Sequence, residues 1–288
     1  MMLTGVFVPL ITPFDADGAV DFSALTTLAE EVLDAGAVGI VALGTTGEPA
    51  SLDIDEQAGV VDVIAKVCSA REAPLLVGAS SHQALDMLCD HPGVTAALCT
   101  VPAFVRPGEA GVVAHFTALA AASPVPLVAY HVPHRTGQQL SVSSLRRLAE
   151  IPRVIGVKYA PGGVDADAVA LLADPLADFA VLCGDDLFVS PMLALGAQGG
   201  ILASAHFATA RFAELAEAWR TGDVARGRDL GRSLAPMSAA LFAEPNPTVI
   251  KAVLHAQGRI PSASVRLPLL PASPEAARAA LVALEHVA

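Results

Sequence analysis

Short runs of β-branched and other apolar residues alternate eight times with longer segments of helical periodicity, and this alternation constrains the fold more than any other feature. The expected strands are residues 5–11, 38–43, 74–78, 96–100, 126–130, 154–158, 179–183 and 199–202. Strands that alternate with helices are typical of a parallel sheet with right-handed crossovers. Eight such units close naturally into a barrel of about 250 residues, so we predict an α/β chain folded as a (β/α)8 TIM barrel.

An open, doubly wound sheet produces the same alternation and is the alternative. It usually carries a glycine-rich dinucleotide turn after a strand, and the sequence has neither G-x-G-x-x-G nor a P-loop. Helices are expected over residues 21–35, after Asp53 (an N-cap with Glu56 three residues later), and over 83–91, 107–122, 141–151, 164–173, 187–195 and 209–221.

No convincing strand follows residue 221, and the remaining sequence has helical periodicity over residues 223–243, 246–257 and 274–287. We therefore expect a barrel over residues 1–222 and a C-terminal helical extension over residues 223–288 that packs on it. An apolar content of 53% is enough for a core of that size.

The charge and the cysteines limit which binding partners and which cellular compartment we expect. The net charge is −12 and no run of Lys and Arg occurs, so we expect no nucleic acid and no anionic membrane as partner. Gly, Pro or a charge interrupts every apolar run before it reaches the length of a membrane span, and the N-terminus has no basic signal region. Four cysteines without a C-x-x-C pair favour free thiols in a reducing cytoplasm over disulfides or zinc.

Lys158 stands at the end of the apolar run Val154-Ile155-Gly156-Val157, and it is one of only three lysines among 17 basic residues. Burial of an unpaired ammonium is costly and tends to produce the neutral amine, which is a nucleophile toward carbonyl compounds. The alternative is a lysine whose charged end reaches solvent where the strand stops.

Other polar residues also follow expected strands, where the loops of a TIM barrel carry function. Residues 44–48, Gly-Thr-Thr-Gly-Glu, are able to turn sharply and point backbone N–H groups at an anion, or else to form an ordinary capped turn. Tyr130 ends its strand and offers a phenol for acid–base chemistry, or a packed ring with a wet hydroxyl. Arg135 is a candidate carboxylate clamp, with a surface arginine as the alternative.

Two further pairs permit metal binding as a minor alternative. His131 and His134 lie in one loop at a spacing of three, but no Cys or carboxylate is near them in the sequence. Asp185 and Asp186 have the chemistry for a divalent ion, although capping of the next helix is the simpler role. Together, the amine, the phenol and the anion-binding turn equip a Schiff-base lyase for keto acids, for which no metal or organic cofactor is implied.

The same segments resemble the dihydrodipicolinate synthase / N-acetylneuraminate lyase family of pyruvate-dependent class I aldolases. The resemblance covers nearly the whole chain and is carried, in family order, by Thr12-Pro13-Phe14, Gly44-Thr45-Thr46-Gly47-Glu48, Tyr130-His131-Val132-Pro133, Gly156-Val157-Lys158 and Glu244-Pro245-Asn246-Pro247. It implies a barrel with a helical C-terminal extension, assembled as a homotetramer made of two dimers.

The resemblance also implies roles for single residues. Lys158 would form the Schiff base with pyruvate, Tyr130 would move protons to and from the intermediate, and Thr45 would pass them on. Thr46 would hold the pyruvate carboxylate, the Ile201 backbone would contact pyruvate, and Arg135 would grip the carboxylate of aspartate semialdehyde. Gly44 is a further expected substrate-binding residue.

Several positions depart from the family pattern, and three of them lie at or next to residues with an expected role. Phe104 replaces a relay tyrosine that would reach across a dimer interface, and a phenyl ring has no proton to relay. Tyr159 replaces a glutamate after the lysine, and His131 replaces an asparagine after the catalytic tyrosine.

Three functions therefore stay open at the level of sequence. The first is condensation of pyruvate with aspartate semialdehyde to 4-hydroxy-tetrahydrodipicolinate. The second is another aldol cleavage or dehydration of a 2-keto-3-deoxy acid, and the third is a keto-acid-binding paralogue with little turnover.

Overall fold

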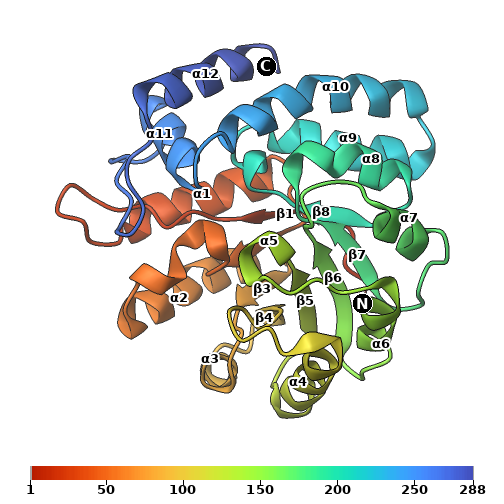
Figure 1. The fold of residues 1–288 in the computed structure, drawn as a ribbon. Helices are drawn as coiled ribbons and strands as arrows, with labels where there is room; N and C mark the ends of the chain where they lie inside the picture. The colour runs from red at the N-terminus through yellow and green to blue at the C-terminus, as the bar shows by residue number, and fades with distance from the viewer. Residues whose placement is uncertain (1, 288) are drawn as a thin grey trace.

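A computed structural model describes residues 2–287 and shows a closed barrel of eight parallel strands with helices around it (Figure 1). Each strand pairs with the next along the chain, and β8 pairs with β1, which confirms the predicted (β/α)8 barrel. The strands are β1 (Gly5–Pro9), β2 (Gly39–Ala42), β3 (Leu75–Gly78), β4 (Val94–Thr100), β5 (Leu127–His131), β6 (Val154–Tyr159), β7 (Ala180–Cys183) and β8 (Gly199–Ile201).

Helices connect the strands as the periodicity predicts, with ends that differ by a few residues. They are α1 (Phe22–Asp34), α2 (Ile54–Ala70), α3 (His82–Asp86), α4 (Gly108–Ala122), α5 (Pro133–Thr136), α6 (Val142–Ala149), α7 (Ala166–Leu172), α8 (Val189–Ala194), α9 (Thr209–Thr221), α10 (Val224–Leu241), α11 (Thr248–Ala256) and α12 (Pro274–Glu285). The expected capping box at α2 is present, because Asp53 accepts from the Glu56 N–H and Glu56 accepts from the Asp53 N–H. The short helix α5 was not expected from the sequence.

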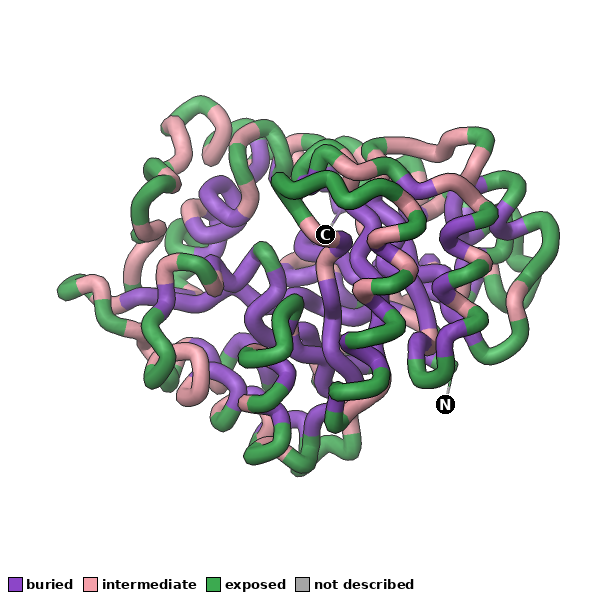
Figure 2. The backbone as a smooth tube through the Cα atoms, turned by 60° about the horizontal axis from the view of Figure 1, so that its bottom comes forward, coloured by how far each residue is buried: buried purple, intermediate pink, exposed green. Residues whose placement is uncertain are grey.

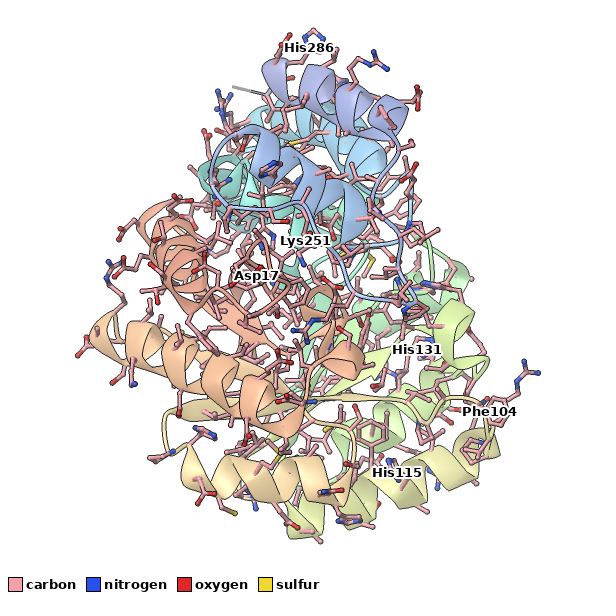
Figure 3. The ribbon with its side chains drawn as sticks, turned by 90° about the vertical axis from the view of Figure 1, so that its left-hand side faces the viewer. Asp17, Phe104, His115, His131, Lys251 and His286 are labelled. Carbon is pink, nitrogen blue, oxygen red and sulfur yellow. The ribbon has the colours of Figure 1, made fainter. Side chains whose placement is uncertain are left out.

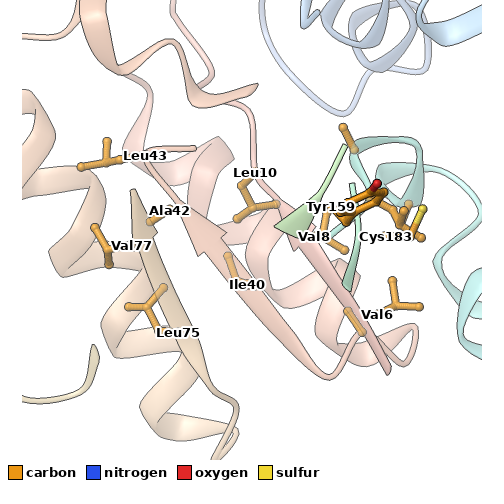
Figure 4. Close-up of a cluster of buried hydrophobic side chains, with 14 of the residues drawn as sticks. Val6, Val8, Leu10, Ile40, Ala42, Leu43, Leu75, Val77, Tyr159 and Cys183 are labelled. Atoms are coloured by element: carbon orange, nitrogen blue, oxygen red, sulfur yellow. The ribbon is translucent and has the colours of Figure 1, made fainter. Parts of the chain in front are cut away.

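Alternation along the strands sorts side chains into two layers. Phe7, Val41 and Leu76 belong to a cluster inside the barrel, whereas Val8 and Ala42, each one residue further on, belong to the cluster between barrel and helices. Figure 4 shows part of this outer cluster, and Figure 2 shows the buried strands surrounded by more exposed helices. A residue's parity on its strand therefore decides whether it faces the barrel interior or the helical layer.

The C-terminal helices α10, α11 and α12 lie together on one side of the barrel (Figure 1). Helix α10 packs against α9 and α12, and α11 packs against α12. Within residues 2–287, no helix combines the length and the apolar character that crossing a membrane requires.

Candidate active site

Two adjoining cavities open where the strands end. The smaller one, about 100 Å³, is lined by Lys158 together with Thr46, Gly184, Asp186 and Ile201. The larger one, about 430 Å³, is lined by the 44–51 turn, the end of β4 and residues 266–269. The two cavities share four wall residues, which are Thr45, Tyr130, Arg135 and Asn246. The structure thus brings the lysine, the phenol, the turn and the arginine to one end of the barrel.

Lys158 is buried, with 7% of its surface exposed, and its Nζ lies 4.3 Å from the centre of the Tyr130 ring. The two residues are paired in register on β6 and β5, so their side chains leave the sheet on the same, inner side. Gly184 makes room for the lysine, because a Cβ at that position would lie 2.8 Å from Lys158 Cε. Solvent exposure of Lys158, the alternative left open by the sequence, is therefore wrong.

Two acidic residues border the lysine, and neither caps a helix as expected. The Asp186 carboxylate accepts from the Ser204 N–H at 2.5 Å, and Asp185 accepts from the Gly162 N–H at 2.7 Å. Asp185 stands at the N-cap position of the next turn, but its side chain makes no capping bond. Burial raises the pKa of Asp186 to about 6, and Lys158 opposes this shift.

The 44–48 segment forms a tight 3-10 turn over residues Thr45–Gly47. The first N–H groups of such a turn have no carbonyl partner within it and remain available to an anion. Thr46 is buried, and its Oγ1 accepts from Asn246 Nδ2 at 2.9 Å, which leaves the Thr46 hydroxyl hydrogen free for another acceptor. Thr45 is exposed on the wall of both cavities.

A buried ion pair ties the same turn to the C-terminal helices. Lys251 Nζ on α11 donates to Glu48 Oε1 at 2.6 Å, and the Arg266 N–H donates to Glu48 Oε2 at 2.9 Å. Burial lowers the pKa of Lys251 to about 8, although Glu48 opposes the shift. Figure 3 shows Lys251 inside the molecule, beneath the C-terminal helices.

Arg135 and Ile201 both reach the site. Arg135 lies on α5, exposed, and borders both cavities, while Ile201 at the end of β8 is buried in the wall of the smaller one. Phe104 lies elsewhere: it is 94% exposed on the loop after β4, at the edge of the molecule in Figure 3.

The other two departures from the family pattern lie outside the cavities and against each other. His131 and Tyr159 are paired in register one residue beyond Tyr130 and Lys158, and their ring centres are 5.5 Å apart. Tyr159 donates to Asp165 at 2.8 Å and packs in the outer cluster near Val8 and Cys183 (Figure 4). Burial lowers the pKa of His131 to about 4. His131 thus faces Tyr159 while His134 lines the smaller cavity, so the two histidines do not converge.

Sequence reasoning missed several wall residues. Asn246, Leu267, Pro268 and Leu269 come from the C-terminal segment, and Ser80 and Thr100 come from the ends of β3 and β4. The Glu244-Pro245-Asn246-Pro247 motif was a signal for Asn246, but its contact with Thr46 spans 200 residues. Thr100 was easier to find from the sequence. It lies two residues after Leu98 on the same strand and so points, like Leu98, into the barrel.

The fold and the site define the class: a (β/α)8-barrel enzyme with a buried lysine and a phenol at the C-terminal ends of adjacent strands. The model of the dihydrodipicolinate synthetase family matches residues 2–287, and the chain belongs to this family.

Similar proteins agree with this assignment. A protein of Neisseria meningitidis serogroup B named 4-hydroxy-tetrahydrodipicolinate synthase is 35% identical over 275 residues, which is 94% of each chain. A protein of the same name from Laribacter hongkongensis is 37% identical over 273 residues, 93% of each chain. The chloride-inhibited dihydrodipicolinate synthase of Acinetobacter baumannii, solved with pyruvate, superposes with a TM-score of 0.93 at 32% identity over 99% of both chains.

Proposed function

We propose that this enzyme condenses pyruvate with aspartate semialdehyde to 4-hydroxy-tetrahydrodipicolinate, through a Schiff base on Lys158. The observation that carries the proposal is the buried Lys158 amine 4.3 Å from the Tyr130 ring, in a cavity that shares four wall residues with a second, larger one. The names of the similar proteins support this choice of reaction over the other keto-acid lyases.

The reaction starts when the lone pair of the Lys158 nitrogen attacks the C2 carbonyl of pyruvate. The resulting carbinolamine loses its hydroxyl as water when Tyr130 supplies a proton, and an iminium ion forms. Loss of a C3 proton then gives the enamine, whose C3 attacks the aldehyde carbon of the second substrate, and the new alkoxide is protonated through Tyr130. The amino group of aspartate semialdehyde then attacks the regenerated iminium carbon, which closes the ring and releases the Lys158 amine. Tyr130 is placed to act as acid and base in these steps, because its ring stands beside the lysine amine.

The remaining side chains bind the two carboxylates. Thr46, held by Asn246, directs its hydroxyl hydrogen to the pyruvate carboxylate, and the turn that starts at Gly44 supplies N–H groups. Thr45 borders both cavities and passes protons outward, and the Ile201 backbone contacts pyruvate. Arg135 holds the carboxylate of aspartate semialdehyde from the rim that the cavities share.

The test is trapping with borohydride followed by turnover. Wild-type protein treated with pyruvate and borohydride should gain one reduced pyruvate on the peptide that contains Lys158, and it should consume aspartate semialdehyde. Lys158→Ala should show neither, while Lys66→Ala, which removes an exposed lysine on α2, should keep both. Labelling without semialdehyde turnover, combined with cleavage of a 2-keto-3-deoxy acid, would assign the other lyase reaction; labelling without any turnover would assign a binding protein.

We also propose a homotetramer of two dimers in the cytoplasm, with the barrel ending at residue 222. Phe104 and Val105, which are 94% and 71% exposed, offer apolar surface for a second copy to cover. The four cysteines are unpaired, as a reducing compartment favours. Light scattering after gel filtration measures the assembly.

A further inference from the structure

Five consecutive strands present polar side chains at the rim of the barrel. They lie at or close to the C-terminal ends of β2, β3, β4, β5 and β6, and are in that order Thr45, Ser80, Thr100, Tyr130 and Lys158. Thr100 is paired in register with Tyr130, and it shares the strand parity of Ala96 and Leu98, which face the barrel interior. Same-face neighbours on adjacent strands are about 5 Å apart at Cβ, so the Thr100 side chain lies next to Tyr130.

Ser80 and Thr100 form a hydrogen-bonded hydroxyl pair. Their oxygens are 2.7 Å apart, and the Thr100 N–H also donates to Ser80 Oγ at 2.9 Å. That N–H fixes the position of the Ser80 oxygen. Whichever hydroxyl donates within the pair, the other keeps a free hydrogen, and both residues line the larger cavity with Tyr130. The pair therefore presents one free donor and spare acceptor capacity to the cavity beside the phenol.

The other hydroxyl groups near the cavities already have hydrogen-bond partners or lie further from β5, the strand of Tyr130. Thr46 accepts from Asn246 and, in the proposed reaction, gives its hydroxyl hydrogen to the pyruvate carboxylate, and Ser51 donates to the Glu48 carbonyl at 2.9 Å. The second tyrosine of the chain, Tyr159, donates to Asp165 in the outer layer. Among the described residues of the larger cavity wall, this leaves Thr45 and the Ser80–Thr100 pair to exchange protons with Tyr130.

We propose, on the basis of the proposed function, that Ser80 and Thr100 are positioning residues. They hold a water molecule next to the Tyr130 hydroxyl and return protons to Tyr130 through that water. When Tyr130 gives its proton to the departing carbinolamine hydroxyl, the phenolate takes one from this water. The water in turn takes one from the hydroxyl pair, and the pair takes one from solvent in the cavity. The path runs in reverse when Tyr130 accepts the C3 proton, so one proton passes between Tyr130 and solvent each time.

The test needs pyruvate alone, which separates the relay from recognition of the second substrate. Exchange of the pyruvate C3 hydrogens in D2O, followed by proton NMR, reports how fast enzyme-bound pyruvate gives up its C3 proton. Thr100→Val keeps the shape but loses the hydroxyl, and it should slow exchange about tenfold or more. Thr100→Ser should restore most of the rate. Ser80→Ala should slow exchange by a similar factor, and the double variant should be no slower than either single one, because the pair acts as a unit.

Borohydride labelling of Lys158 by pyruvate should remain complete in every variant, which shows that fold and Schiff-base formation are intact. Exchange at the wild-type rate in Thr100→Val overturns the relay alone. A rise only in the KM for the aldehyde, with unchanged exchange, also overturns it and assigns the pair to substrate recognition. Slow exchange in Thr100→Ser equal to that in Thr100→Val overturns it too. A wild-type protein with neither labelling nor exchange overturns the proposed function together with the relay.

Discussion

On β5 and β6, a residue that faces the barrel interior is followed directly by one that faces the helical layer. On the inner face, Tyr130 and Lys158 meet at the cavities. On the outer face, His131 and Tyr159 meet under the helices, with Tyr159 bound to Asp165. Both outer residues depart from the family pattern, whereas both inner residues keep it.

The difference teaches how a barrel separates chemistry from packing. Because side chains alternate, the outer pair has only to fit its packed neighbours, while the inner pair faces the cavities in which we propose that the reaction takes place. The unusual residues His131 and Tyr159 are therefore compatible with catalysis. The one departure with a chemical consequence is Phe104, which lies on neither face and has no proton to give.

The two tyrosines give the largest expected contrast. Tyr130→Phe should lower kcat by about 10²–10⁴-fold, the usual value of one general acid–base group, with borohydride labelling slowed as well. Tyr159→Phe is the matched control: kcat should stay near wild type, and unfolding should be easier by about 1 kcal/mol, the loss of one hydrogen bond. Steady-state kinetics and urea unfolding measure both. Equal losses of kcat in the two variants would remove the distinction between the faces.

Gly184 offers a steric test of the inner face. A Cβ at this position would lie 2.8 Å from Lys158 Cε and 2.9 Å from its Cγ. Gly184→Ala should therefore displace the amine and cost about 10²-fold in kcat/KM, because small misplacements of reacting groups are expensive. Gly163→Ala, where an added Cβ meets nothing within 4 Å, should leave kcat/KM unchanged. A fully active Gly184→Ala variant would contradict the inference that the Lys158 side chain packs tightly against Gly184.

Residues on the outer face should affect how the free energy of unfolding depends on pH, and should not affect catalysis. Both ring nitrogens of His131 are buried without a hydrogen-bond partner among the described residues, and burial lowers its pKa to about 4. The unfolded state binds a proton from pH 6.5 downward, whereas the folded state resists until about pH 4, so stability from this group is complete above pH 6.5 and falls as the pH drops.

His131→Phe should remove that loss. Relative to the variant, the wild type should lose roughly 3 kcal/mol of unfolding free energy between pH 6.5 and pH 4. His206, whose pKa burial also lowers to about 4, contributes equally to both proteins and cancels in the difference. Urea unfolding at the two pH values measures it, and parallel curves for the two proteins would refute it. Activity at pH 7 should be unchanged.

The barrel and its central residues were predictable, because they depend on short-range pattern. Eight alternations predict eight strands, and parity at a strand's end places Lys158 and Tyr130 on one side. The Asp53 cap and helix α9 followed from local signals in the same way. The Schiff-base chemistry that we propose also starts from a local signal, one amine in an apolar run.

What escaped prediction depends on contacts between distant residues. Asp185 and Asp186 appeared to be helix caps, but their partners, Gly162 and Ser204, lie 23 and 18 residues away. The space that Gly184 leaves for Lys158, and the Ser80–Thr100 pair, exist only once neighbouring strands are aligned. No local signal marks such contacts.

The link between Glu48 and Lys251 has a consequence for the newly made chain. The two residues are 203 positions apart, and Asn246 is 200 from its partner Thr46. During synthesis the barrel strands, Lys158 among them, leave the ribosome well before the segment that props up the 44–48 turn. Under the proposed function, a nascent barrel has the amine of Lys158 early and the support of its carboxylate-binding turn late, so we expect reactivity toward keto acids only when translation is nearly finished.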